Sequence, residues 1–295
     1  MDTLQTILTR PFSVIIFDID GVLTEHAGTV SEEMIEKITS ILNKRIYVNL
    51  VSGRPRYVNQ YYRTKGGRDI NEVFRQIRQS HTLTDSDNLK YLFGFEQNGS
   101  AVFDGFADND SRKKPLDLQF PTMDPALQKE LWHYLSTTAG SMFSHAENKS
   151  HSMALWVNNE HATLHNLPRV KAQVDLGLSH FKMDKQLKSF QTQGTIDIGP
   201  AGISKATAVD FYIKAGFTLQ QIARIGDSTY TGGNDQPMVM YNHTGDDGGF
   251  SVEHYSELDQ FPVTSLPQII GKTGVAATHW LLDHIRFQEN QPYVF

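Results

Sequence analysis

The sequence predicts an α/β protein with a doubly wound, mainly parallel sheet and a separate α+β unit inserted into it. Three observations support this fold class. The chain opens with a strand–helix–strand alternation, the alternation breaks off in the middle, and it returns toward the C-terminal end. We therefore expect a core made of residues 1–105 and 194–295, with an inserted unit at 106–193. A chain of 295 residues with 39% hydrophobic residues is long and apolar enough for such a core.

The first elements predict a parallel pair of strands joined by a helix. Ser13–Phe17 is a continuous apolar run, which is typical of a strand buried on both faces. Ser31–Lys44 has apolar residues at helical spacing, and Ser31 is a suitable N-cap. Ile46–Val51 is the second strand. A crossover of this kind is expected to be right-handed.

The next stretch is less regular. Residues 61–90 carry many charges and predict a surface helix with loops. Tyr91–Phe95 and Ala101–Phe103 flank Glu96–Gly99, whose composition predicts a hairpin turn. Phe106–Leu116 is polar enough to be a linker into the inserted unit.

The inserted unit mixes helices and strands that do not extend the first alternation. Its expected elements are helices at 125–137 and 162–176, a strand at 153–157 and a further segment at 181–190. The parallel pattern is then expected to return with a strand at 195–198, a helix at 205–215, a strand at 222–225 and a C-terminal helix from Thr273.

Composition excludes several functional classes. There are 27 Lys and Arg against 33 Asp and Glu, a formal charge of −6, which argues against a nucleic-acid partner. Cysteine is absent, so disulfides, thiolate metal sites and a cysteine nucleophile are excluded. No apolar stretch approaches the roughly 20 residues of a membrane span, and no secretory signal is visible. We expect a cytoplasmic protein, a monomer or small homo-oligomer, that makes no contact with a membrane.

Acidic residues follow two of the predicted core strands. Asp18 and Asp20 come after the first strand, Asp227 comes after the strand at 222–225, and Asp235 follows eight residues later. Functional groups gather at the carboxyl ends of parallel strands, so these carboxylates should converge. Converging carboxylates need a hard cation, and oxygen ligands favour Mg²⁺.

These residues belong to four short motifs that resemble those of the haloacid dehalogenase-like superfamily of phosphoryl-transfer enzymes. The motifs occur in order as Asp18-x-Asp20-Gly21 with Thr24, Ser52-Gly53-Arg54, Lys205 in Gly202–Lys205, and Gly226-Asp227 with Asn234-Asp235. A large insertion between the second and third motifs is similar to the C2-type cap that is common among sugar phosphatases.

The resemblance implies a catalytic role for each motif. Asp18 would be the nucleophile that forms an aspartyl-phosphate, and Asp20 would protonate the leaving oxygen and then activate water. Ser52 would hydrogen-bond a phosphoryl oxygen. Lys205 at a helix start would neutralise Asp18 and the transferring group.

The resemblance also implies the residues that bind metal and substrate phosphate. Mg²⁺ would be held by the carboxylates of Asp18 and Asp227 and the main-chain carbonyl of Asp20. Asp235 would be either a further metal ligand or a residue that orients ligands and waters. The backbone N–H groups of the loop at Gly53-Arg54 would assist in binding the phosphoryl group.

One segment of the inserted unit points to a sugar. Glu147 and Lys149, followed by Met153–Trp156, are similar to a Glu-x-Lys segment in the cap of trehalose-phosphate phosphatases, where the two side chains bind sugar hydroxyls. Glu147 and Lys149 are therefore predicted substrate ligands. That family continues with a His-Tyr-Arg-like segment where this chain has Trp156-Val157-Asn158, so the identity of the sugar phosphate stays open.

Two other functions remain possible from the sequence. The loop Asp227–Asp235 resembles that of eukaryotic-type phosphomannomutases, which hold a second phosphate on several cap arginines. Between Asp104 and Pro200 this chain has only Arg112 and Arg169, which favours hydrolysis over a mutase reaction. The third possibility is a non-catalytic sugar-phosphate-binding protein with the same fold.

Overall fold

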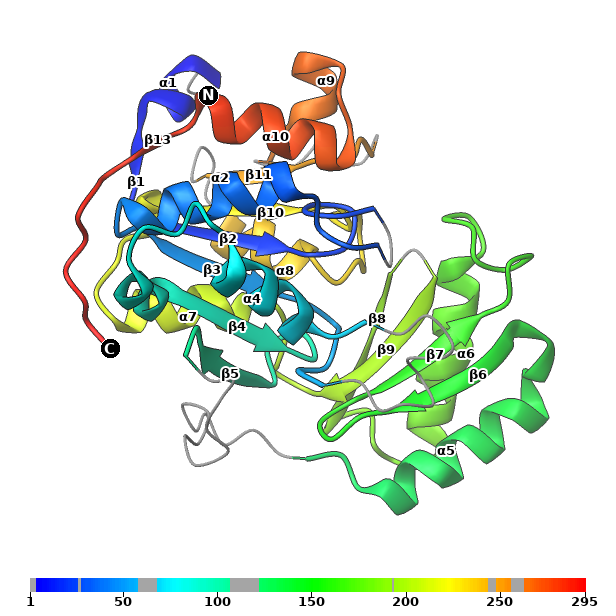
Figure 1. Cartoon of the computed structure of the whole chain (residues 1–295). Helices are drawn as coiled ribbons and strands as arrows, with labels where there is room; N and C mark the ends of the chain where they lie inside the picture. Colours follow the sequence, from blue (N-terminus) through cyan, green and yellow to red (C-terminus); the bar gives the residue numbers. More distant parts are fainter. Residues whose placement is uncertain are drawn as a thin grey trace. The chain divides into compact units, whose positions relative to one another are not determined.

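The chain forms two compact units (Figure 1). The computed structural model describes residues 4–25, 28–57, 68–106, 122–192, 194–243, 248–255 and 263–295. The first unit comprises Met1–Leu118, Ser204–Thr231 and Asp235–Phe295, and the second comprises Gln119–Ile203 and Gly232–Asn234. Among the described residues, no helix is both long and apolar enough to span a lipid bilayer.

The first unit is built on a seven-stranded sheet of order β12-β11-β10-β2-β3-β4-β5. All neighbouring strands are parallel except the final hairpin pair, β4 and β5. The strands are β2 (Val14–Asp18), β3 (Tyr47–Val51), β4 (Leu92–Glu96), β5 (Ala101–Asp104), β10 (Ile222–Gly226), β11 (Gly249–Ser251) and β12 (Thr264–Ser265). This confirms the predicted α/β fold and its parallel core.

The central strands of this sheet are buried along their whole length, because helices cover the sheet. The helices of this unit are α1 (Leu4–Thr9), α2 (Glu32–Asn43), α4 (Ile70–Gln79), α7 (Ala206–Lys214), α8 (Gln236–Val239), α9 (Leu266–Ile270) and α10 (Gly274–His284). Helix α2 begins where the sequence predicts, since the Ser31 hydroxyl accepts a hydrogen bond from the N–H of Met34 at 3.2 Å. An ion pair between Lys37 and Asp283 joins α2 to α10.

Short elements complete the first unit. Strands β1 (Pro11–Phe12) and β13 (Arg286–Phe287) pair in parallel, with Phe12 opposite Phe287, although they lie near opposite ends of the chain. The 3-10 turns are η1 (Ser86–Tyr91), η3 (Leu219–Gln221) and η4 (Tyr241–His243).

The second unit is a four-stranded antiparallel sheet with two helices. Its strand order is β6-β7-β9-β8. The strands are β6 (Phe143–Asn148), β7 (Met153–Val157), β8 (Leu187–Gln191) and β9 (Thr195–Pro200), the helices are α5 (Pro125–Thr138) and α6 (Leu167–His180), and η2 (Gly140–Met142) precedes β6. Leu131 and Leu135 of α5 and Val174 of α6 share one apolar cluster with strand residues. The α+β character predicted for the insertion is therefore correct.

The expected boundaries of the inserted unit need correction. The strand predicted at 195–198 is not part of the core sheet, because β9 pairs with β7 and β8. The insertion therefore runs on to Ile203, rather than ending at 193, and begins at Gln119 rather than 106. A strand this short can fit either sheet, so its pairing decides where it lies.

Other differences are small. Helix α6 begins at Leu167, because Pro168 occupies its first turn, and it extends to His180 rather than ending at 176. Strand β6 was not expected as a strand. Residues 107–116 of the predicted linker and 61–67 of the predicted surface segment lie outside the described residues.

Candidate active site

Two predicted site carboxylates lie at the ends of adjacent strands. Asp18 is the last residue of β2, and Asp227 directly follows β10. These strands pair in parallel, with Phe17 opposite Ile225, so both carboxylates reach the same edge of the sheet. Both side chains are almost fully buried. The structure therefore confirms that the carboxylates of Asp18 and Asp227 lie close together.

Gly21 makes room for this convergence. Its φ is +75°, a left-handed conformation that favours glycine. A Cβ at this position would lie only 2.3 Å from Oδ2 of Asp227. The first motif therefore needs glycine both for its turn and for the close approach of the Asp227 carboxylate.

Asp235 is held by main-chain donors. Its Oδ2 accepts hydrogen bonds from the N–H groups of Asp227 and Ser228, each at 3.0 Å. A Cβ on Gly226 would lie 2.7 Å from the Cβ of Asp235, so glycine is also required here. Asp235 thus fixes the course of the chain that carries Asp227.

Lys205 joins the carboxylates from the first and fourth motifs. It stands at the N-cap of α7, is 1% exposed, and its Nζ lies 2.8 Å from Oδ1 of Asp18 and 2.5 Å from Oδ1 of Asp235. Burial disfavours its charge, but the charges of Asp18 and Asp235 and their hydrogen bonds outweigh burial and raise the pKa of Lys205. The lysine is therefore a permanent cation at this site.

One ammonium does not balance the three carboxylates. Burial, followed by the charge of Asp235, raises the pKa of Asp18 to about 7, although Lys205 opposes this. Burial and the charges of Asp235 and Asp18 also raise the pKa of Asp227 well above its usual value. The cluster is therefore short of positive charge.

The donor set fits a divalent cation. Carboxylate oxygens of Asp18, Asp227 and Asp235 lie within 4.8 Å of one another. An all-oxygen set of this kind suits Mg²⁺. Two oxygens of Asp235 already contact Lys205 and backbone N–H groups, so Asp18 and Asp227 are the carboxylates best suited to bind the cation.

The second motif follows β3. The Ser52 hydroxyl is buried and accepts a hydrogen bond from the N–H of Arg54 at 3.1 Å. Gly53 lies between them in this turn. The turn therefore presents a hydroxyl and consecutive backbone groups close to the first motif, as predicted.

Arg54 binds the second aspartate of the first motif. Its Nε and Nη2 donate to Oδ2 and Oδ1 of Asp20 at 2.8 and 2.6 Å. Although burial disfavours the charge, the hydrogen bonds to Asp20 and the charges of Asp20 and Asp18 raise the pKa of Arg54. The sequence singled out both residues but did not predict that they contact each other.

The turn between β4 and β5 supports the site. The sequence predicted this turn but not its contacts with the second motif. The N–H of Gln97 donates to the carbonyl of Arg54 at 3.1 Å, and that of Asn98 donates to the carbonyl of Ser52 at 2.9 Å. A Cβ on Gly99 would lie 2.4 Å from the carbonyl oxygen of Ser204. The turn thus braces the second motif and lies against the start of α7. Its Asn-Gly pair, which tolerates positive φ, was the available signal.

The predicted sugar ligands lie in the second unit. Glu147 is on β6, and its Oε2 is 3.9 Å from Nζ of Lys149 in the turn that follows. The two side chains therefore form the expected charged pair.

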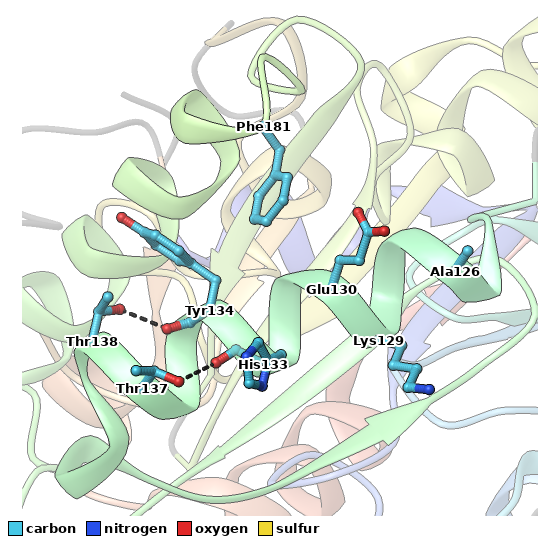
Figure 2. A pocket seen from close by; sticks show the side chains of 8 residues that line it. All are labelled: Ala126, Lys129, Glu130, His133, Tyr134, Thr137, Thr138 and Phe181. Carbon is cyan, nitrogen blue, oxygen red and sulfur yellow. Dashed lines mark hydrogen bonds between the residues drawn. The ribbon is translucent and has the colours of Figure 1, made fainter.

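A separate pocket of about 710 Å³ runs along α5 in the second unit (Figure 2). None of the predicted site residues line it. The residues that do so are Ala126, Lys129, Glu130, His133, Tyr134, Thr137, Thr138 and Phe181.

Comparison with known proteins gives two similarities in sequence. Residues 15–72, which contain the first two motifs, match the family model described as haloacid dehalogenase-like hydrolase. A phosphomannomutase from Schizosaccharomyces pombe is 24% identical over 239 residues, which cover 78% of this chain and 86% of that protein.

Solved structures share the fold. An IMP-bound, N-terminally truncated IMP-nucleotidase from Plasmodium falciparum has a TM-score of 0.62 at 14% identity, covering 94% of this chain and 69% of the other. A putative HAD/COF-like hydrolase from Plasmodium vivax has a TM-score of 0.62 at 16% identity, covering 96% and 98%. These comparisons show a similarity in sequence to haloacid dehalogenase-like hydrolases over residues 15–72 and a shared fold over most of the chain.

Proposed function

We propose that this protein is a Mg²⁺-dependent phosphatase that cleaves a sugar phosphate through an aspartyl-phosphate intermediate. The observation that carries the proposal is the contact of Lys205 with both Asp18 and Asp235, beside Asp227. This arrangement holds a buried carboxylate in place as a nucleophile and supplies positive charge where a phosphoryl group would arrive.

The first step is attack by Asp18 on phosphorus. Lys205 holds Oδ1 of Asp18, which leaves the other carboxylate oxygen to form the new bond. The bond from phosphorus to the ester oxygen breaks, and that oxygen takes a proton from Asp20. In the second step water attacks the phosphorus of the aspartyl-phosphate, Asp20 accepts a proton from it, and phosphate leaves with Asp18 restored.

Asp18, Asp227 and the main-chain carbonyl of Asp20 would hold Mg²⁺, which offsets the negative charge of the phosphoryl oxygens and of Asp18. We assign Asp235 the orienting role, because its carboxylate contacts Lys205 and two backbone N–H groups. The Ser52 hydroxyl, whose oxygen accepts the N–H of Arg54, would donate its proton to a phosphoryl oxygen, and the backbone N–H of Gly53 would assist.

Arg54 prepares Asp20 for its role. The forked contact fixes the Asp20 carboxylate in one orientation, but it also favours the ionised form. Asp20 must carry a proton to act as an acid. We therefore expect the arriving phosphoryl group to compete for the guanidinium of Arg54.

The proposed substrate is a sugar phosphate bound through Glu147 and Lys149, with trehalose 6-phosphate as the first compound to test. Carboxylate and ammonium groups suit hydroxyl recognition, and sites built on such hydrogen bonds reject ligands that leave them unpaired. The alternative is a hexose-phosphate mutase, as the similarity to a phosphomannomutase suggests.

The cations of the second unit favour hydrolysis. Arg169 is its one arginine in the ranges 122–192 and 194–203 that the structure describes. Lys149 is paired with Glu147, and Lys171 with Asp175. A mutase would need several such groups for a second phosphate.

The test is phosphate release from a panel of mono- and disaccharide phosphates and nucleoside monophosphates, with Mg²⁺ or with EDTA, using Asp18→Asn as the control. Mg²⁺-dependent release that the variant lacks supports the phosphatase, and the preferred ester names the substrate class. Isomerised hexose phosphate without phosphate release would establish a mutase instead. Ligand binding with neither product, unchanged in Asp18→Asn, would indicate a binding protein.

A further inference from the structure

The three tryptophans of the chain differ in what they pack against. Trp132 packs against the apolar cluster of the second unit, and Trp280 packs against that of the first. Within the described residues, Trp156 packs against neither cluster. Tryptophan is a large apolar side chain that usually contributes to a core or to a binding surface, so its presence at position 156 favours a binding surface.

Trp156 lies on the face of the second sheet that points away from α5 and α6. Met153 and Leu155, on the same strand β7, belong to the apolar cluster that contains residues of both helices. Successive side chains of a strand point to opposite faces of the sheet, so Ala154 and Trp156 point the other way. Trp156 is partly exposed on that face.

The predicted sugar ligand Glu147 lies on the same face as Trp156. On strand β6, Glu147 is opposite Ala154, and His145 is opposite Trp156. The rings of His145 and Trp156 are stacked, with centroids 5.4 Å apart and an interplanar angle of 11°. The indole therefore lies next to the pair formed by Glu147 and Lys149 rather than among core side chains.

Stacking on a histidine does not by itself mark a binding site, since Trp280 and His284 of α10 also stack, with centroids 4.1 Å apart. Trp156 differs in its other neighbours on the sheet face. These are Ala154, two residues back along β7, and Thr195, which is opposite Trp156 on β9. Both side chains are small, so they leave part of the indole available to a ligand held by Glu147 and Lys149.

We propose that Trp156 is a specificity-determining residue whose indole packs against the C–H face of the substrate's sugar ring, while Glu147 and Lys149 bind the hydroxyls at its edge. A sugar ring carries polar hydroxyls around its edge and apolar C–H groups on its faces. Ligand sites commonly combine an aromatic surface with a few polar groups that fix orientation. The inference rests on the proposed function, because it takes a sugar phosphate as the substrate.

Trp156→Leu tests this inference, because leucine is apolar but has no flat ring. Trp156→Phe keeps an aromatic ring and should retain most of the affinity. Trp280→Leu is the matched control, since it removes the other tryptophan that stacks on a histidine, in the first unit. All proteins also carry Asp18→Asn, so that no ester is turned over. Binding is measured by isothermal titration calorimetry with Mg²⁺ present.

The probes are trehalose 6-phosphate, glucose 6-phosphate, mannose 6-phosphate, IMP and inorganic phosphate. In Trp156→Leu we expect the dissociation constant of the tightest-binding sugar phosphate to rise about tenfold, as a close aromatic contact contributes, with that of inorganic phosphate unchanged. Trp280→Leu should change neither.

Three results would overturn the inference. The first is an unchanged affinity for the sugar phosphate in Trp156→Leu. The second is an equal loss of affinity for sugar phosphate and inorganic phosphate, which would mean a general structural defect. The third is a loss confined to IMP, which would mean that the indole stacks on a nucleobase.

The two proposals fail in different ways. Sugar phosphates that bind the parent protein but are not hydrolysed by wild type overturn the proposed function, and the affinities of Trp156→Leu still decide the role of the indole. Hydrolysis of a sugar phosphate by wild type, with its affinity unchanged in Trp156→Leu, overturns only the inference. A parent protein that binds no sugar phosphate more tightly than inorganic phosphate also overturns the inference.

Discussion

Arg54 and Asp20 form a two-pronged ion pair, with N···O distances of 2.8 and 2.6 Å, at the junction of the first and second motifs. The two residues are 34 positions apart in the chain. A planar guanidinium matches the geometry of a carboxylate, and a lysine ammonium cannot make the same pair of contacts. The orientation of Asp20 therefore depends on arginine at position 54.

Arg54→Lys should lower kcat/KM roughly 10- to 100-fold, because one of the two charged hydrogen bonds is lost, a loss of about 1.5–3 kcal/mol. The measurement is steady-state phosphate release over a range of pH. Arg68→Lys is the control, since Arg68, an exposed residue just before α4, forms an ion pair with Glu72 of that helix. Equal activity of Arg54→Lys and wild type would contradict a role in orienting Asp20.

Lys205→Met should abolish most activity and destabilise the protein in the absence of Mg²⁺. Removing one partner of a buried ion pair costs about 3–5 kcal/mol, because the remaining charges are left uncompensated. Urea unfolding with and without Mg²⁺ tests this. Lys214→Met, at the other end of α7, provides a comparison with little expected effect. A Lys205→Met protein as stable as wild type without Mg²⁺ would show that the carboxylates there are neutral.

Gly21→Ala should weaken Mg²⁺ binding as well as folding, since its Cβ would displace the Asp227 carboxylate. Gly271→Ala is a matched control. Gly271 also has a positive φ, +67°, but nothing lies within 4 Å of an added Cβ. The control should lose only about 1–2 kcal/mol from backbone strain. Calorimetric Mg²⁺ titration of both variants separates displacement of the Asp227 carboxylate from backbone strain. Equal Mg²⁺ affinities in Gly21→Ala and Gly271→Ala would contradict the displacement.

The metal-free protein should lose stability as pH rises from about 4 to about 7. The pKa of Asp18 is raised from 3.8 to about 7, so the folded state holds a proton that the unfolded state has already released. Its contribution is most favourable below the unfolded pKa and is lost as pH rises through this window. Urea unfolding at pH 5 and pH 7.5 should show the difference, and Asp18→Asn should reduce it.

Mg²⁺ should counteract this loss. Cation binding requires deprotonated carboxylates, so its stabilising effect should be greater at pH 7.5 than at pH 5. A stability that is independent of pH without Mg²⁺ would contradict the raised pKa of Asp18.

Local patterns in the sequence predicted most of the helices and strands. Ser13–Phe17 predicted β2 because an unbroken apolar run suits a strand buried on both faces, and Ser31 predicted the start of α2 because its hydroxyl can cap a helix. Asp18 and Asp227 were predicted to converge because parallel strands end at one edge.

Contacts between residues far apart in the chain could be identified only from the folded structure. The strand at 195–198 belongs to the second sheet, because a short strand fits whichever neighbours pair with it. The contacts of Asp20 with Arg54, of Lys205 with Asp235 and of Asn98 with Ser52 follow from strand order and loop geometry. The same holds for the raised pKa of Asp18, since burial and neighbouring charge belong to the folded arrangement and to no local pattern in the chain.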